Sequence, residues 1–229
     1  MHHYFRGTTL FSSPFFPYHS SMLVKDVMTH EVVAIGPDLP IKDVNALMEQ
    51  RNIRHFPILS DERLIGIVSD RDVGRVGSAH PKAPKGVGFK DLVNRIMVSP
   101  VLSAHPLDPV EEAAKLLRQR KIGALPVLDG DALVGIVTAT DLLDAFTKMS
   151  GVYGATTHLE VEVENRPGAL AELLSEVAER GVNVPSVMTV KSGPEYVQLS
   201  LRAETIDGKG LARQLRSAGF AVLWLAEKP

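Results

Sequence analysis

The chain has 229 residues, 45% of them hydrophobic, and carries 25 Lys and Arg against 27 Asp and Glu, a formal net charge of −2. This composition can build hydrophobic cores, and the missing basic excess argues against nucleic acid as a partner. Cysteine is absent, which excludes disulfides, thiolate zinc sites and cysteine nucleophiles and suits the cytoplasm. No apolar run approaches the ~18 residues of a membrane-spanning helix, so we expect no membrane association.

Residues 1–21 carry no periodic hydrophobic pattern and no apolar stretch of signal-peptide length. We interpret them as a disordered tail, or as upstream sequence ahead of a true start at Met22. Residues that resemble the start of a folded domain begin directly after this point.

An internal repeat follows, and a shift of 69 residues aligns its two copies without a gap. Gly66–Val68 then falls on Gly135–Val137, and Asp72 falls on Asp141. Each copy is predicted as strand, helix, strand, strand, helix, from short apolar runs, helical spacing and turn residues. The predicted elements of the first copy are strands 32–35, 56–59 and 64–68 and a helix from Pro40 to Met48. Those of the second are strands 101–103, 124–128 and 132–137, a helix over 110–120 and a helix from Ala139.

The domain boundaries follow from this pattern. We assign 22–76 to the first copy, 77–88 to a linker rich in Gly, Pro and Lys, and 89–149 to the second copy. Residues 155–227 read βαββαβ, the order of a ferredoxin-like domain. The fold class is therefore α/β (α+β), with two βαββα repeats followed by a ferredoxin-like unit.

Two motifs recur in both copies. One is a Pro between apolar strand residues, in Phe56–Ile58 and Leu125–Val127. The other is Gly, two apolar residues, Ser or Thr, and an Asp three positions later, in Gly66–Asp72 and Gly135–Asp141. These motifs resemble the CBS domain. The resemblance implies that the two copies pair into a Bateman module, which binds adenosine-containing ligands in clefts between the copies.

The chemistry of the second motif suits a nucleotide. A carboxylate accepts two hydrogen bonds, so Asp72 and Asp141 fit the adjacent hydroxyls of a ribose. Ser69 and Thr138 stand at the start of a helix, where backbone N–H groups and the helix dipole favour a phosphate. The alternative is that both residues are only helix N-caps, a common role for Ser and Thr.

The two copies differ in charge at the matching positions. Arg71 of the first copy corresponds to Thr140 of the second. Arg54 and His55 likewise correspond to the small residues Gly123 and Ala124, which leave room for a base. We expect the first cleft to favour phosphate-rich ligands, since a guanidinium presents several donors to phosphate oxygens. In the alternative, Arg54 and Arg71 are surface charges or pair with Asp70.

The third domain resembles the ACT domain, through a turn close to that family's Asp-x-Pro-Gly-x-Leu. The family often binds an amino acid at a dimer interface, which the resemblance implies for this turn, while a purely structural turn is the alternative. Asn stands where the family has its Asp, which removes a carboxylate partner for a ligand ammonium. The candidate ligand contacts are Asn165, Arg166, Pro167, Gly168 and Asn183.

The order of CBS repeats and ACT domain resembles the AcuB family, linked by name to acetoin utilisation. We therefore expect a cytoplasmic, homodimeric sensor that relays nucleotide occupancy to its ACT domain or to a regulated protein. The expected ligand is AMP, ADP, ATP, S-adenosylmethionine or NAD, and no catalytic residue, metal or required cofactor is predicted. The alternatives are an enzyme that uses the nucleotide and a structural dimer with degenerate clefts.

Overall fold

The computed structural model describes residues 22–225, and the N-terminal tail expected over 1–21 lies outside this part of the chain. Two compact units share the chain. One comprises the residues up to 116 together with 126–135, and the other comprises 117–125 and the residues from 136 onward. The division falls within the second repeat, so this repeat contributes residues to both units.

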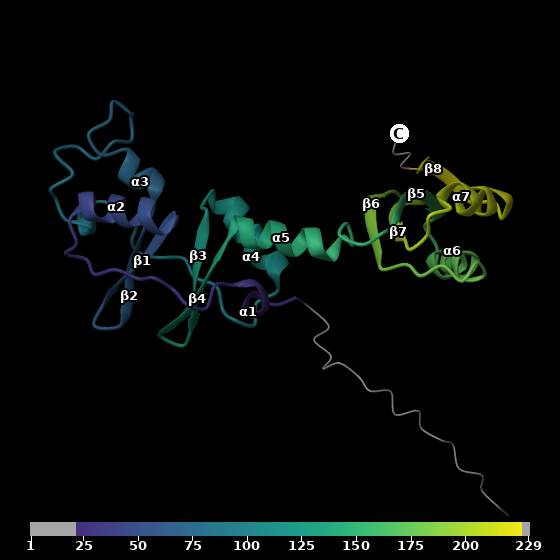
Figure 1. Ribbon diagram of the computed structural model, residues 1–229, viewed down its shortest axis with the longest axis horizontal. Helices are drawn as coiled ribbons and strands as arrows, with labels where there is room; N and C mark the ends of the chain where they lie inside the picture. The colour runs from purple at the N-terminus through teal and green to yellow at the C-terminus, as the bar shows by residue number, and fades with distance from the viewer. Residues whose placement is uncertain (1–21, 226–229) are drawn as a thin grey trace, which may run out of the picture. The chain divides into compact units, whose positions relative to one another are not determined.

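The first copy folds around a buried core made by one helix and one hairpin (Figure 1). Ile41, Val44 and Met48 recur along one side of the helix and pack with Phe56 and Ile58, all of them nearly inaccessible to water. The hairpin turns at Asp61 and Glu62, which both have positive φ, as a two-residue turn matched to the twist of its strands requires. The elements are α2 (Ile41–Arg51), β1 (His55–Ser60), β2 (Arg63–Ser69) and α3 (Asp70–Gly74).

The second copy repeats this order, as the sequence predicts. Its two strands form a separate two-stranded sheet. Its last helix has 11 residues where that of the first copy has 5. The elements are α4 (Val110–Arg120), β3 (Ala124–Asp129), β4 (Ala132–Thr138) and α5 (Ala139–Met149).

The first predicted strand of each copy is reduced to a single bridge. Ile35 pairs with Ile58 in parallel orientation, and Ala104 pairs with Val127 in the same way. The predictions of regular strands over 32–35 and 101–103 are therefore wrong. A run of three or four apolar residues fits a strand, but only one residue of each run reaches a partner.

The lead-in segments at the start of the two copies, residues 22–28 and 89–97, are exchanged in space. In the first lead-in segment, Val24 of α1 (Val24–Val27) donates its backbone N–H to the Asp108 carbonyl of the second copy at 2.9 Å. In the second, the helical spacing of 89–97 yields only a 3₁₀ turn, η1 (Val93–Arg95). Val93 donates to Leu39 of the first copy, also at 2.9 Å. Each lead-in segment thus completes the other copy.

A methionine and a glycine lock each exchanged segment in place. A Cβ built on Gly66 would overlap the side chain of Met97, and a Cβ built on Gly135 would overlap that of Met28. Both glycines lie in the second strand of a hairpin, and both methionines end a lead-in segment. Glycine is required here because only its missing side chain lets the methionine approach the strand.

The C-terminal part forms a four-stranded antiparallel sheet in the order β6-β7-β5-β8 (Figure 1). Alternate residues of β5, Leu159, Val161 and Val163, pack with the buried faces of two helices, at Leu173 and Leu211 among others. The ferredoxin-like prediction is confirmed. The other face of the sheet carries polar side chains such as Glu160 and Gln198 beside the exposed Met188 and Trp224. The elements are β5 (Thr157–Glu164), α6 (Ala169–Ala178), β6 (Ser186–Ser192), β7 (Tyr196–Ala203), α7 (Gly208–Ser217) and β8 (Ala221–Leu225). Across residues 22–225, no helix has the length and apolarity needed to cross a membrane.

Candidate functional site

The predicted nucleotide residues of the first copy come together where β1 begins and β2 ends. The hairpin register places His55 opposite Ser69. The Asp70 backbone N–H, the first of α3, donates to the Arg54 carbonyl at 2.9 Å. Arg54, His55, Ser69 and Asp72 therefore form one local cluster, which we call the first Asp cluster and which also includes Arg71.

A reciprocal capping box builds this cluster. The Ser69 hydroxyl donates to Asp72 Oδ2 at 2.6 Å, and the Ser69 backbone N–H donates to the same oxygen at 3.0 Å. In return the Asp72 N–H donates to Ser69 Oγ at 3.3 Å. Ser69 is thus the N-cap of α3, and its contact with a ligand stays a prediction. The cap also fixes the direction of the Asp72 carboxylate.

The second copy reproduces the arrangement with different side chains. Thr138 Oγ1 and N–H both donate to Asp141 Oδ2 at 2.8 Å, and the Asp141 N–H donates to Thr138 Oγ1 at 3.3 Å. The Ala139 N–H donates to the Gly123 carbonyl at 3.0 Å. Gly123, Ala124, Thr138, Thr140 and Asp141 make up this second Asp cluster, so the structure brings together both predicted sets, each within its own copy.

The two clusters differ in whether the Oδ1 oxygen of the Asp carboxylate is left to bind a ligand. Asp72 Oδ1 lies 3.5 Å from a guanidinium nitrogen of Arg75. The shift of 69 residues places Asp144 at the position of Arg75, so the second copy has no equivalent cation. Within residues 22–225, Oδ1 of Asp141 has no partner and can accept a hydrogen bond from a hydroxyl. Sequence reasoning missed Arg75, although the repeat alignment contains the signal.

His55 stands among charges of both signs. Partial burial lowers its pKa, and Arg54 and Arg71 act in the same direction, while Asp70 and Asp72 oppose the shift. The imidazole is therefore neutral near pH 7, so the positive charge of the first Asp cluster comes from its arginines. Arg71 is exposed, and only its backbone N–H contacts the Asp70 carboxylate, at 2.7 Å, so the expected alternative of an Arg71–Asp70 ion pair is not formed among the described residues.

The turn after β5, which carries the predicted ACT ligand contacts, uses its own polar groups internally. The Asn165 side chain donates to the Gly193 carbonyl and its backbone N–H to the Glu195 carbonyl, both at 2.7 Å. Arg166 makes a bidentate ion pair with Glu172, at 2.8 and 2.6 Å, and a further bond to Glu164. These contacts lower the pKa of Glu172 and raise that of Arg166.

Two further predicted ACT contacts are also placed. Gly168, which follows Pro167, has φ +90° as the N-cap of α6, a conformation that favours glycine. Asn183 donates to Glu204 Oε2 at 3.0 Å and precedes β6, whereas Asn165 contacts the hairpin that follows β6. Strand β6 has seven residues and is therefore about 23 Å long, and Asn183 lies before one end of it while Asn165 contacts the loop at the other end. The structure does not bring Asn183 next to the turn within one chain.

Comparison with known families and proteins agrees with this architecture. The CBS domain model matches residues 24–77 and 93–148, and the ACT domain model matches 157–220. A CBS domain-containing protein of Bacillus subtilis, YhcV, is 30% identical over 142 residues, which cover 62% of this chain and 96% of that protein. The homoserine O-acetyltransferase of Methanohalobium evestigatum is 31% identical, but the chain covers only 24% of its length.

Solved structures align with the CBS pair. The CBS domain pair of protein MJ0100, in complex with 5′-methylthioadenosine and S-adenosyl-L-methionine, matches with 26% identity and a TM-score of 0.50, over 56% of this chain and 98% of that one. A Vibrio cholerae protein assigned to acetoin utilization (AcuB) matches with 30% identity and a TM-score of 0.49, over 58% of this chain and 96% of that one.

These findings define a protein with two tandem CBS domains and a C-terminal ACT domain. The chain belongs to the family of CBS domain-containing proteins.

Proposed function

We propose that this protein is a regulatory sensor that binds an adenosine-containing ligand at its CBS pair. The observation that carries the proposal is the duplicated capping box, which holds one carboxylate per copy in a fixed direction. In the second Asp cluster, Oδ1 of Asp141 is available to accept a hydrogen bond from a ribose hydroxyl. The complex of the MJ0100 domain pair with two adenosine compounds supports this ligand class.

Because the two clusters differ in charge, they are proposed to bind different ligands. The first cluster contains Arg54 and Arg71 and has Arg75 beside its carboxylate, so it favours ligands with phosphates. The second cluster pairs its carboxylate with Gly123 and Ala124, which suits a ligand recognised through ribose and base. AMP, ADP, ATP and NAD are therefore assigned to the first cluster, and S-adenosylmethionine to the second.

A thermal-shift panel with these five ligands tests the proposal. A ligand that binds only the folded state at 100 times its Kd adds about 2.7 kcal/mol to the free energy of unfolding. Asp141→Asn keeps an oxygen that can accept a hydrogen bond from the Thr138 N–H and should reduce the shift for S-adenosylmethionine, while Asp72→Asn should reduce it for ATP. Asp131→Asn, in an exposed turn, is the control. No shift with any ligand would contradict the proposal.

The proposal includes an output. Helix α5 begins at the second Asp cluster and ends at Met149, a few residues before the first ACT strand. Ligand at Asp141 is proposed to bias this helix and so the ACT domain or a regulated protein, in a cytoplasmic homodimer. The acetoin or carbon metabolism implied by the AcuB resemblance is the proposed setting. Recovery of chemically altered nucleotide after long incubation would favour the enzyme alternative instead.

A further inference from the structure

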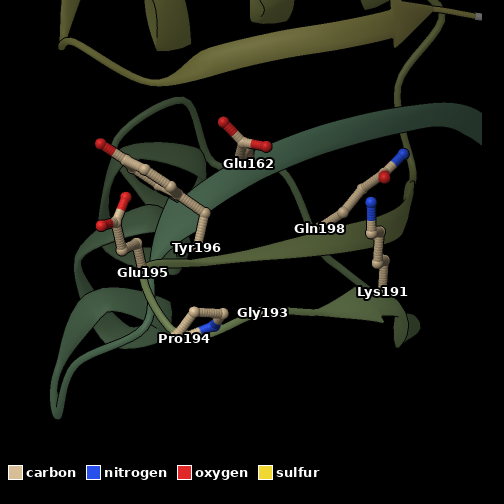
Figure 2. A pocket seen from close by; sticks show the side chains of 7 residues that line it. All are labelled: Glu162, Lys191, Gly193, Pro194, Glu195, Tyr196 and Gln198. Carbon is tan, nitrogen blue, oxygen red and sulfur yellow. The ribbon is translucent and has the colours of Figure 1, made fainter.

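The ACT sheet has a pocket of about 270 Å³ on its open face, at the end where β6 turns into β7 (Figure 2). Its lining combines a cation, two carboxylates, a phenol ring and an amide, namely Lys191, Glu162, Glu195, Tyr196 and Gln198. The pocket lies on the side of the sheet opposite the helices. The nucleotide clusters of the CBS pair contribute no residue to it.

The charged groups of the pocket have no partner within the described part of the chain. Among these residues, neither Lys191 nor Glu162 nor Glu195 takes part in an ion pair or side-chain hydrogen bond, although other acidic groups of this domain do. The phenol of Tyr196 likewise has no partner in residues 22–225, and the residue is 50% exposed. Gln198 is engaged, because its amide nitrogen donates to Glu160 at 2.7 Å.

Strand register sets the spacing of the opposite charges. Gln198 of β7 is paired with Lys191 of β6 on one side and with Glu162 of β5 on the other. Neighbouring strands are about 4.8 Å apart, so the Cα atoms of Lys191 and Glu162 are separated by about 10 Å. Gln198 stands between them in the strand register, and Figure 2 shows Lys191 beside Gln198 and Glu195 beside Tyr196.

The hairpin that carries these groups is held firmly. Asn165 donates hydrogen bonds to the Gly193 and Glu195 carbonyls of this hairpin, and the Gly193 N–H donates to the Tyr196 carbonyl at 2.9 Å. A site whose backbone is already fixed loses little conformational entropy when a ligand binds. The asparagine that sequence reasoning assigns to ligand contact thus supports a neighbouring pocket.

We propose that this pocket binds a small molecule with an ammonium group at one end and a carboxylate at the other, the class of the ω-amino acids. The carboxylate pairs with Lys191. The ammonium lies between Glu162 and Glu195, against the Tyr196 ring, where charge-assisted hydrogen bonds and a cation–π contact act together. An α-amino acid carries both charges on one carbon and cannot reach both Lys191 and Glu162, which lie on strands separated by β7.

Calorimetry or ligand-observed NMR on the full chain tests this with 5-aminopentanoate, glycine, cadaverine and glutarate as probes. We expect 5-aminopentanoate to bind with a Kd of about 1 mM or tighter, and each of the other three to bind at least about tenfold more weakly. Lys191→Met and Glu162→Gln should each weaken 5-aminopentanoate by about tenfold. Glu179→Gln, at the C-terminal end of α6, is the matched control and should change nothing.

Three results would overturn the proposal. These are equal binding of cadaverine, preferred binding of glycine, or no binding of 5-aminopentanoate at roughly 10 mM. The variants lie on an exposed sheet face, and a circular-dichroism melt checks their folding. Nucleotide binding to the CBS pair is measured on the same samples, so failure at this pocket is distinguished from failure of the proposed nucleotide site.

Discussion

Gly135→Ala should destabilise the protein although it adds only one methyl group. The new Cβ would overlap the Sδ and Cγ atoms of Met28, which is itself buried with 8% exposure. Overpacking of this kind costs about 1–3 kcal/mol, and the flexible methionine should keep the cost in the lower half of that range. Because Met28 belongs to the exchanged lead-in segment, the loss measures how strongly this segment is held.

Urea unfolding gives the free energy of Gly135→Ala, and a double-mutant cycle assigns its cause. Met28→Ala alone should cost about 2–5 kcal/mol, since it leaves a cavity. In the double variant the added methyl group occupies part of that cavity, so the combined loss should be smaller than the sum. Gly36→Ala is the control, because a Cβ there has no atom within 4 Å and φ is not positive. If Gly135→Ala and Gly36→Ala unfold alike, the proposed lock is wrong.

The pKa shifts and the assembly supply further predictions. The folded pKa of His55 lies below 6.5, so the unfolded chain binds more protons, and its contribution to stability is lost as the pH falls through this range; His55→Gln should flatten that slope in urea unfolding. The pKa of Glu172 is lowered by Arg166, so ionised Glu172 contributes stability at pH values above its ordinary pKa, and this contribution is lost as the pH falls through the lowered pKa. In an NMR titration Arg166→Met should return this pKa toward 4.5. Light scattering should give the mass of a dimer at micromolar concentration, and a monomer would contradict the proposed assembly.

The repeat made much of the CBS fold predictable, because both copies carry the same apolar spacing and the same Gly-to-Asp motif. The capping boxes follow from local sequence, since Ser69 and Asp72 lie within one helical turn of each other. The exchange of the lead-in segments could not be predicted in this way. It depends on contacts between residues far apart in the sequence, such as Val24 and Asp108. Hydrophobic periodicity carries no information about such contacts.

The ACT site was less predictable than the CBS clusters. The turn sequence identifies the domain but does not say whether Asn165 faces a ligand or the β6–β7 hairpin, because that depends on where the loop after β6 lies. The pocket on the open sheet face could not be predicted from the sequence for a similar reason. Lys191, Gln198 and Glu162 are spread over three strands, and only the register of the folded sheet places them in one row.

Isothermal titration of S-adenosylmethionine into the wild-type chain and into Asp141→Asn and Asp72→Asn tests the central proposal most directly. We predict saturable binding that Asp141→Asn weakens by about tenfold or more, because the amide nitrogen cannot accept a hydrogen bond from the ribose. Asp72→Asn should leave this affinity nearly unchanged, and ATP should show the reverse pattern. Equal affinities in all three proteins would contradict the assignment of the two Asp clusters as nucleotide sites.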